Sequence, residues 1–391
     1  MNNRSILVAQ IESLLQHLTW AEETMGDGHI GGGLRDAASS RFGNSFNDIR
    51  RELETLRDDL AVVDDSDALD AYWQTLTNHK KTCEGLFAES LNFLGGALLR
   101  ALSQVDNLCK ISDALLTELS ERAGEEWHRF TILAEGNFFT ETTGIIRLPF
   151  PDYSIWNLPV AVHELGHYVG PRIRDAGGAS LFDNELQQLK MSYADATKAK
   201  RQANHWREEF SDVFATYASG PAYACSCLVL AFNPADGSAY NDGETHPAYA
   251  KRAYLILGML EEMSGKNHQY DAVVKFLQKL WANNLRAAGQ TKELGDDDVT
   301  QLDNTLLKIF TILTRTSKVE YKGWARATQL ADDLAGKKGV AQMLRAGDTI
   351  NDVINAAWLW RIRQPEEEAA QVQNITNKAI KLSGRILRNE V

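Results

Sequence analysis

The segment Leu158–Gly170 reads LPVAVHELGHYVG and is the most informative part of the sequence. On a helix, residues four apart lie on one face, so His163 and His167 can offer imidazole nitrogens to one metal ion. Neutral imidazole is a preferred ligand of Zn²⁺. Glu164, one residue further round the helix, is placed to act as a general base on metal-bound water. The segment therefore predicts a helix that carries a zinc site.

The surroundings of this motif predict that the helix is buried, because its other residues are largely apolar. These are Leu158, Val160, Val162, Leu165 and Val169. Histidines and a glutamate in such an environment are costly without partners. A catalytic zinc site takes three protein ligands, so a third ligand must come from elsewhere. The metzincin pattern would place a histidine at position 173, where this chain has Ile173, and Asp175 is a weaker aspartate alternative.

The best source of a third ligand is the segment His205–Tyr217, which reads HWREEFSDVFATY. As a helix it has large apolar side chains on one face and small or acidic ones on the other. Small side chains let the second face approach another helix closely. We expect Glu208 on that face to bind the metal, with Glu209, nearer the large apolar side chains, as the alternative. Asp212, one turn further on, can accept a hydrogen bond from a ligand histidine and fix its tautomer.

These two segments together resemble the gluzincin zinc metallopeptidases. In that family HExxH is followed on a later helix by E-x-x-[AS]-D-x-x-A, and here that second pattern runs from Glu208 to Ala215. His246-Pro247 followed by Arg252 is similar to the branch that contains the CAAX-prenyl and heat-shock membrane proteases. The resemblance covers roughly residues 132–257.

The resemblance implies a specific set of roles. It implies that His163, His167 and Glu208 bind zinc, that Glu164 is the base, and that Asp212 supports a ligand. That branch is built on transmembrane helices and this chain has no long apolar run, so the membrane role and the prenyl substrate are not carried over.

The expected reaction is hydrolysis of peptide bonds in a protein or peptide substrate by metal-activated water. His246 is the leading candidate to stabilise the oxyanion, with Arg252 positioning it or the substrate. Tyr217, Tyr223 and Tyr249 are the alternatives for this role. The strand expected at residues 144–148 is a candidate edge that pairs with the extended substrate. The competing hypothesis is a catalytically silent zinc-binding scaffold that recruits other proteins.

Composition narrows the class of protein further. The chain has 391 residues and a formal net charge of −12, and it lacks long runs of Lys and Arg. Nucleic-acid binders usually carry a basic face, so we expect no nucleic-acid partner. No stretch approaches the length of a membrane span, and the amino terminus lacks the pattern of a signal peptide. We therefore expect a soluble, cytoplasmic protein that does not bind membranes, with its four cysteines buried as small apolar side chains.

The predicted fold class is mainly α with a small β element, an α+β arrangement. Apolar residues at three- and four-residue steps predict a helical bundle over residues 1–128, broken near residues 26–33 and 64–67. A zincin-like metallopeptidase core is expected over residues 129–262, and a helical region over residues 263–391. The helical arms are candidates to bind a regulatory protein or to limit access to the cleft.

Overall fold

The computed structural model describes most of the chain. The residues it describes are 3–26, 32–63, 69–102, 106–127, 131–134, 138–140, 145–149, 154–175, 177–290, 292–336 and 338–390. The helix breaks expected near residues 26–33 and 64–67 lie largely or wholly outside these ranges.

The described residues are mainly helical with one small sheet, which confirms the predicted fold class at this level. No described helix combines the length and the apolar character that a membrane span requires. The chain divides into two compact units. Unit 1 contains Met1–Gln104, Ile132–Ala134 and Thr140–Ile145, and unit 2 contains Val105–Thr131, Glu135–Phe139 and Ile146–Val391.

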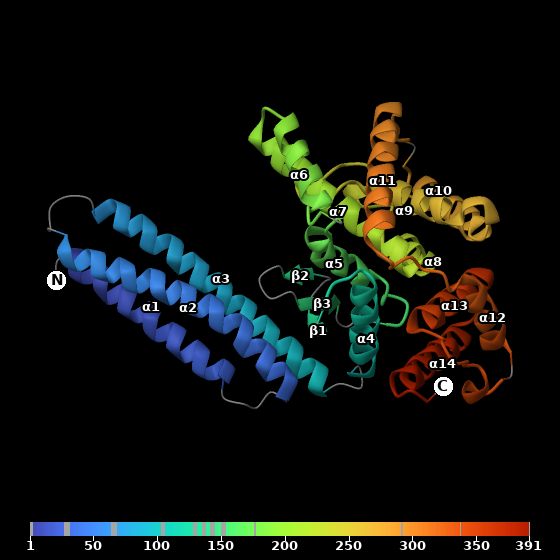
Figure 1. Cartoon of the computed structure of the whole chain (residues 1–391), viewed down its shortest axis with the longest axis horizontal. Coiled ribbons are helices and arrows are strands. Elements are labelled where there is room, and N and C mark those ends of the chain that lie inside the picture. Colours follow the sequence, from blue (N-terminus) through green and yellow to red (C-terminus); the bar gives the residue numbers. More distant parts are fainter. Residues whose placement is uncertain are drawn as a thin grey trace. The chain divides into compact units, whose positions relative to one another are not determined.

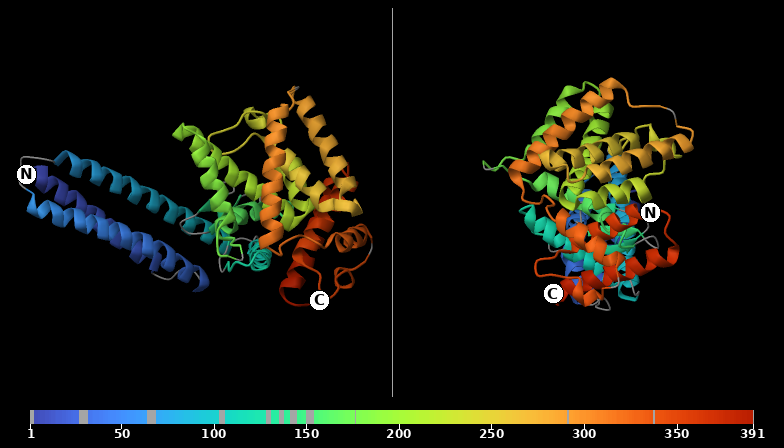
Figure 2. Two further views of the ribbon diagram at one scale, coloured as in Figure 1. Left: turned by 45° about the horizontal axis from the view of Figure 1, so that its top comes forward. Right: turned by 90° about the vertical axis from the view of Figure 1, so that its right-hand side faces the viewer.

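Unit 1 is dominated by three long helices that lie alongside one another (Figures 1 and 2). They are α1 (Asn3–Gly26), α2 (Gly32–Val62) and α3 (Leu69–Leu102). Their heptad-like apolar stripes form the interface between them, as the spacing predicts. The buried side chains of these stripes include Leu7, Ile11, Leu18, Phe46, Leu53, Leu60 and Phe93.

Three short strands are described, namely β1 (Thr131–Ala134), β2 (Phe138–Thr140) and β3 (Ile145–Pro149). They form a sheet in the order β1-β3-β2. The expectation that residues 144–148 form a free edge is therefore wrong for the described part of that segment, since β3 lies between two neighbours. Gly144 itself lies outside the described residues. Ile145 and Ile146 are buried, as a central strand requires.

Unit 2 contains the remaining helices. They are α4 (Asp106–Arg122), α5 (Val160–Val169), α6 (Leu181–Ser192), α7 (Ala196–Ser219), α8 (Pro221–Cys225), α9 (Tyr249–Ser264), α10 (Asp271–Ala287), α11 (Asp296–Thr316), α12 (Trp324–Ala335), α13 (Ile350–Arg363) and α14 (Ala369–Leu387).

Helix α7 is at the centre of this unit and contacts α5, α6, α9 and α11. The last three helices, α12, α13 and α14, pack on one another, and α13 also contacts α8 (Figure 1). A short π-helical segment, Ser226–Ala231, continues directly from α8. The two segments singled out from the sequence thus belong to one compact unit with the C-terminal helices. All four cysteines of the chain are buried.

Candidate metal centre

Helix α5 carries the HExxH motif and is buried along nearly its whole length. Of its residues, only Val160 and His167 are not fully buried. Pro159 precedes its first residue, and the helix ends at Val169, after which Gly170–Arg172, with Pro171, forms one 3₁₀ turn. A proline can precede a helix because its missing N–H is not needed there, and it rarely continues one. The apolar residues around the motif thus place two imidazoles and a carboxylate in the interior of unit 2.

Helix α7 approaches α5 closely at one glycine. A Cβ atom added to Gly166 would lie 2.9 Å from the Cα atom of Ser211 on α7. A side chain at position 166 would therefore clash with α7. The two helices pack this closely because Gly166 has no side chain and Ser211 has a small one. The start of α7 is fixed by Asp195, whose carboxylate accepts hydrogen bonds from two backbone N–H groups of the first turn. The close approach brings the acidic face of α7 to the histidines of α5.

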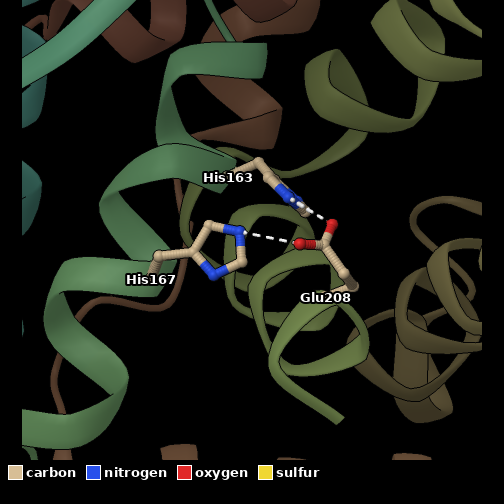
Figure 3. A group of neighbouring side chains, drawn as sticks. All are labelled: His163, His167 and Glu208. Atoms are coloured by element: carbon tan, nitrogen blue, oxygen red, sulfur yellow. Dashed lines mark hydrogen bonds and ion pairs between the residues drawn. The ribbon is translucent and has the colours of Figure 1, made fainter. Parts of the chain in front are cut away.

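His163, His167 and Glu208 form a group that can hold a metal ion. Their ligand atoms all lie within 4.8 Å of one another, and no other such group occurs among the described residues. Nε2 of His163 lies 3.2 Å from Oε2 of Glu208, and Nε2 of His167 lies 3.3 Å from its Oε1. Figure 3 shows both imidazoles of α5 directed at the carboxylate of α7. Glu209, the alternative ligand, lies outside the group.

The donor set suits a metal ion such as zinc. Imidazole nitrogen and carboxylate oxygen are both ordinary zinc ligands. The two nitrogen–oxygen distances, 3.2 and 3.3 Å, end on the two different oxygens of Glu208, so both histidines face the one carboxylate.

The charges around the group call for a cation. Burial by itself lowers the pKa of His163, but Asp212 and then Glu208 outweigh it and raise that pKa to about 10. Burial opposes ionisation of Glu208, yet His163 and His167 hold the pKa of Glu208 well below its usual range. Buried carboxylates are stable only with a positive partner. A proton supplies that charge in the metal-free chain, and a metal ion can supply it instead.

Asp212 lies behind His163 and is completely buried. Arg252 donates to both of its oxygens, from Nε at 2.7 Å and from Nη2 at 2.8 Å. The Tyr223 hydroxyl donates to its Oδ1 at 2.5 Å, and Nδ1 of His163 lies 3.0 Å from the same oxygen. Burial opposes ionisation, but Arg252 and His163 hold the pKa of Asp212 well below its usual range. The carboxylate therefore orients His163 with Nε2 towards Glu208.

Glu164 and His246 lie next to the group without belonging to it. Glu164 is 8% exposed, and no described residue forms a hydrogen bond or an ion pair with its carboxylate. Nε2 of His246 lies 3.4 Å from Oε2 of Glu208, while its side chain is 58% exposed. Burial lowers the pKa of His246, although the charge of Glu208 opposes this. Nε2 of His246 is thus within reach of a ligand of the metal, and Glu164 directly follows His163 in the chain.

Two of the tyrosines considered as oxyanion donors lie against other parts of unit 2. Tyr217 packs edge-on against Phe310 with ring centroids 6.2 Å apart, and burial raises its pKa to about 12. Tyr249 stacks on Phe232 at 4.9 Å. The structure thus gathers His246 and Arg252 around the group, but it places Tyr217 elsewhere.

Sequence reasoning missed part of the arrangement. Tyr223 was expected only as an alternative oxyanion donor, but its hydroxyl lies between Asp212 and Nδ1 of His163, 3.1 Å from the latter. No role was expected for Asn351 and Asn355, which are both buried on α13. The available signal was two amides four residues apart in an otherwise apolar run, which indicates buried hydrogen bonds.

Comparison with known proteins identifies no relative: no family model, no curated protein and no solved structure matches this chain. At this level the chain is a mainly helical protein with a His-His-Glu group that can hold a metal ion.

Proposed function

We propose that the protein is a zinc-dependent endopeptidase of the gluzincin type. The observation that carries the proposal is the convergence of His163, His167 and Glu208 from two packed helices, with Glu164 next to His163 in the sequence. Structural zinc sites are closed by four protein ligands, whereas catalytic sites keep a position open for water or substrate. A three-residue group, with the exposed His246 outside it, favours the open kind.

Each neighbouring residue has a role in this proposal. Bound zinc supplies Lewis acidity and makes water acidic enough to lose a proton near neutral pH. Glu164 would accept that proton, since its carboxylate is not engaged by another described side chain. The Thr245 hydroxyl lies 2.8 Å from Nδ1 of His246, and donation to that nitrogen places the imidazole proton on Nε2, which faces Oε2 of Glu208 at 3.4 Å. His246 then donates Nε2–H to the oxyanion that develops on the scissile carbonyl.

Arg252 acts on the metal ligands rather than on the substrate in this account. Its guanidinium is occupied by two hydrogen bonds to Asp212. This two-point contact fixes the carboxylate that in turn orients His163. A protein or peptide substrate and a regulatory protein partner for the helical arms remain predictions from the sequence.

The test compares the wild type with Glu164→Gln. The variant keeps all three members of the metal group, so its zinc content should equal that of the wild type. Cleavage of a broad peptide library should fall about 10²–10⁴-fold, the usual contribution of a general base. Equal zinc content with no cleavage by either protein would favour the catalytically silent scaffold. Absence of zinc from both would contradict both functions.

A further inference from the structure

One face of α13 carries three buried side chains that can donate hydrogen bonds. Asn351, Asn355 and Trp358 follow one another at steps of four and three residues, which places them on one side of the helix. Each is 1% exposed. All three bind backbone groups next to the helices that carry the candidate metal centre.

The two asparagines hold the chain where α7 ends and α8 begins. Nδ2 of Asn351 donates to the carbonyl of Ala218 at 2.9 Å, and Nδ2 of Asn355 donates to that of Ser219 at 2.7 Å. Oδ1 of Asn355 accepts the backbone N–H of Ala222 at 2.9 Å. The last carbonyls and the first N–H groups of helices have no partners within the helix. Here α13 supplies those partners to two helices at once.

This turn determines where Tyr223 lies. Gly220 has φ 65° and ψ −151°, a conformation almost restricted to glycine. A Cβ atom at Gly220 would also lie 2.3 Å from the ring of Tyr321. Because the chain reverses here, Tyr223 returns to Asp212, and its ring stacks on that of His163 at 6.3 Å. The turn thus couples α13 to a side chain in contact with a metal ligand.

The third residue of the face acts on the segment that leads into α5. Nε1 of Trp358 donates to the carbonyl of Trp156 at 3.1 Å, and the Ser226 hydroxyl donates to the same oxygen at 2.7 Å. The two indole rings pack edge to face with centroids 5.3 Å apart. Nε1 of Trp156 donates to the Thr376 hydroxyl of α14 at 3.0 Å. Trp156 lies only four residues before Val160, the first residue of α5.

We infer that Asn351, Asn355 and Trp358 form a brace that positions the metal ligands of α5 and α7. The brace rests on the proposed function, because its purpose is to preorganise His163 towards zinc. Metal ligands are commonly oriented by outer groups whose loss weakens metal binding. Here the orienting contact, Tyr223 to Asp212, is itself set by asparagines from the C-terminal region.

The brace changes what is expected when the C-terminal helices are deleted. A C-terminal arm that limited access to the cleft would raise cleavage when removed. Deletion of the residues after Gly336 removes α13, and with it all three members of the brace. Such a deletion should therefore weaken zinc binding.

The experiment measures zinc affinity of the metal-free full-length chain by competition with a chromophoric chelator. Asn355→Ala and Tyr223→Phe should each weaken binding about 10-fold. The double variant should lose little more than either single variant, since both act through one contact. Leu382→Ala, a buried deletion on α14 outside the brace, should lower thermal stability and leave affinity unchanged. The visible spectrum of cobalt bound to Asn355→Ala should be shifted relative to that of cobalt bound to the wild type.

A second variant keeps the brace testable if Asn355→Ala does not fold. Trp358→Phe removes the bond to the carbonyl of Trp156 and part of the indole but keeps an aromatic ring, and it should weaken zinc binding several-fold. Three results would overturn the brace and leave the proposed function standing. They are unchanged zinc affinity in the brace variants, losses of zinc affinity that add fully in the double variant, and an equal loss of zinc affinity in Leu382→Ala. Failure of the wild type to bind zinc would overturn the proposed function and the brace together.

Discussion

Helices α5 and α13 are both buried, and each carries two polar side chains four residues apart. On α13 these are Asn351 and Asn355, whose amides bind backbone groups of neighbouring segments. On α5 they are His163 and His167, whose Nε2 atoms face the carboxylate of Glu208. The same spacing on two largely buried helices thus leads to different partners.

This difference shows how a structural pair of polar side chains can be distinguished from a metal site. Neutral amides on α13 meet neutral backbone groups, so their hydrogen bonds are complete within the protein. The imidazoles on α5 face the carboxylate of Glu208, whereas the buried charge of Asp212 is already balanced by Arg252. A buried amide pair that satisfies itself indicates structure, whereas a buried imidazole pair that faces a carboxylate can hold a cation.

The largest expected effect is a loss of zinc affinity that distinguishes two adjacent acids on α7, Glu208 and Glu209. Glu208→Gln should weaken zinc binding more than about 100-fold, since even the loss of an outer group costs up to that much. Glu209→Gln is the matched control, because Glu209 is buried but lies outside the metal group. It should keep the wild-type affinity in the same chelator competition. Equal losses in both variants would contradict the assignment of Glu208.

A smaller loss of zinc affinity is expected when Asp212, which supports the ligand His163, is changed. Asp212→Asn removes the charged acceptor that orients His163 and that Arg252 binds, so zinc affinity should fall about 10–100-fold. Asp242→Asn serves as the control, because Asp242 binds Lys251 and the backbone of Ala248 instead. Isothermal titration with zinc measures both. An affinity for Asp212→Asn within about 2-fold of the wild type would argue against its supporting role.

On α13 the expected effect is on stability, including that of the metal-free chain. Asn351→Leu leaves the carbonyl of Ala218 without its donor in the interior. The cost of such an unsatisfied buried group is about 1–3 kcal/mol. Urea denaturation of the metal-free variant should show this decrease. A variant as stable as the wild type would mean that the amide network of α13 is not required for folding.

The smallest effect is expected at the exposed end of the same helix. Arg363 pairs with Asp332 at 2.9 Å, but the two side chains are 45% and 70% exposed. Water screens such a pair, so Arg363→Ala should change the free energy of unfolding by less than about 1 kcal/mol. The same urea denaturation checks this. A cost as large as that of Asn351→Leu would show that burial does not set the scale of these effects.

The sequence predicted the metal group better than its surroundings. Spacing alone places His163 and His167 on one face, and the small residues of α7 single out Glu208, because both are local properties of a helix. The position of β3 inside the sheet depends on its neighbours, which no pattern within Ile145–Pro149 reveals. The contact between Asn355 and Ala222 joins residues 133 positions apart, and only the folded chain brings them together.

The most direct test of the central claim is the zinc content of purified protein after removal and return of the metal. The account predicts one tightly bound zinc ion per wild-type chain and none in His163→Ala. His205→Ala is the control, because His205 is a buried histidine of α7 that binds the carbonyl of Gly243 instead. It should retain the ion. The same zinc content in all three proteins, or none in the wild type, would contradict the account.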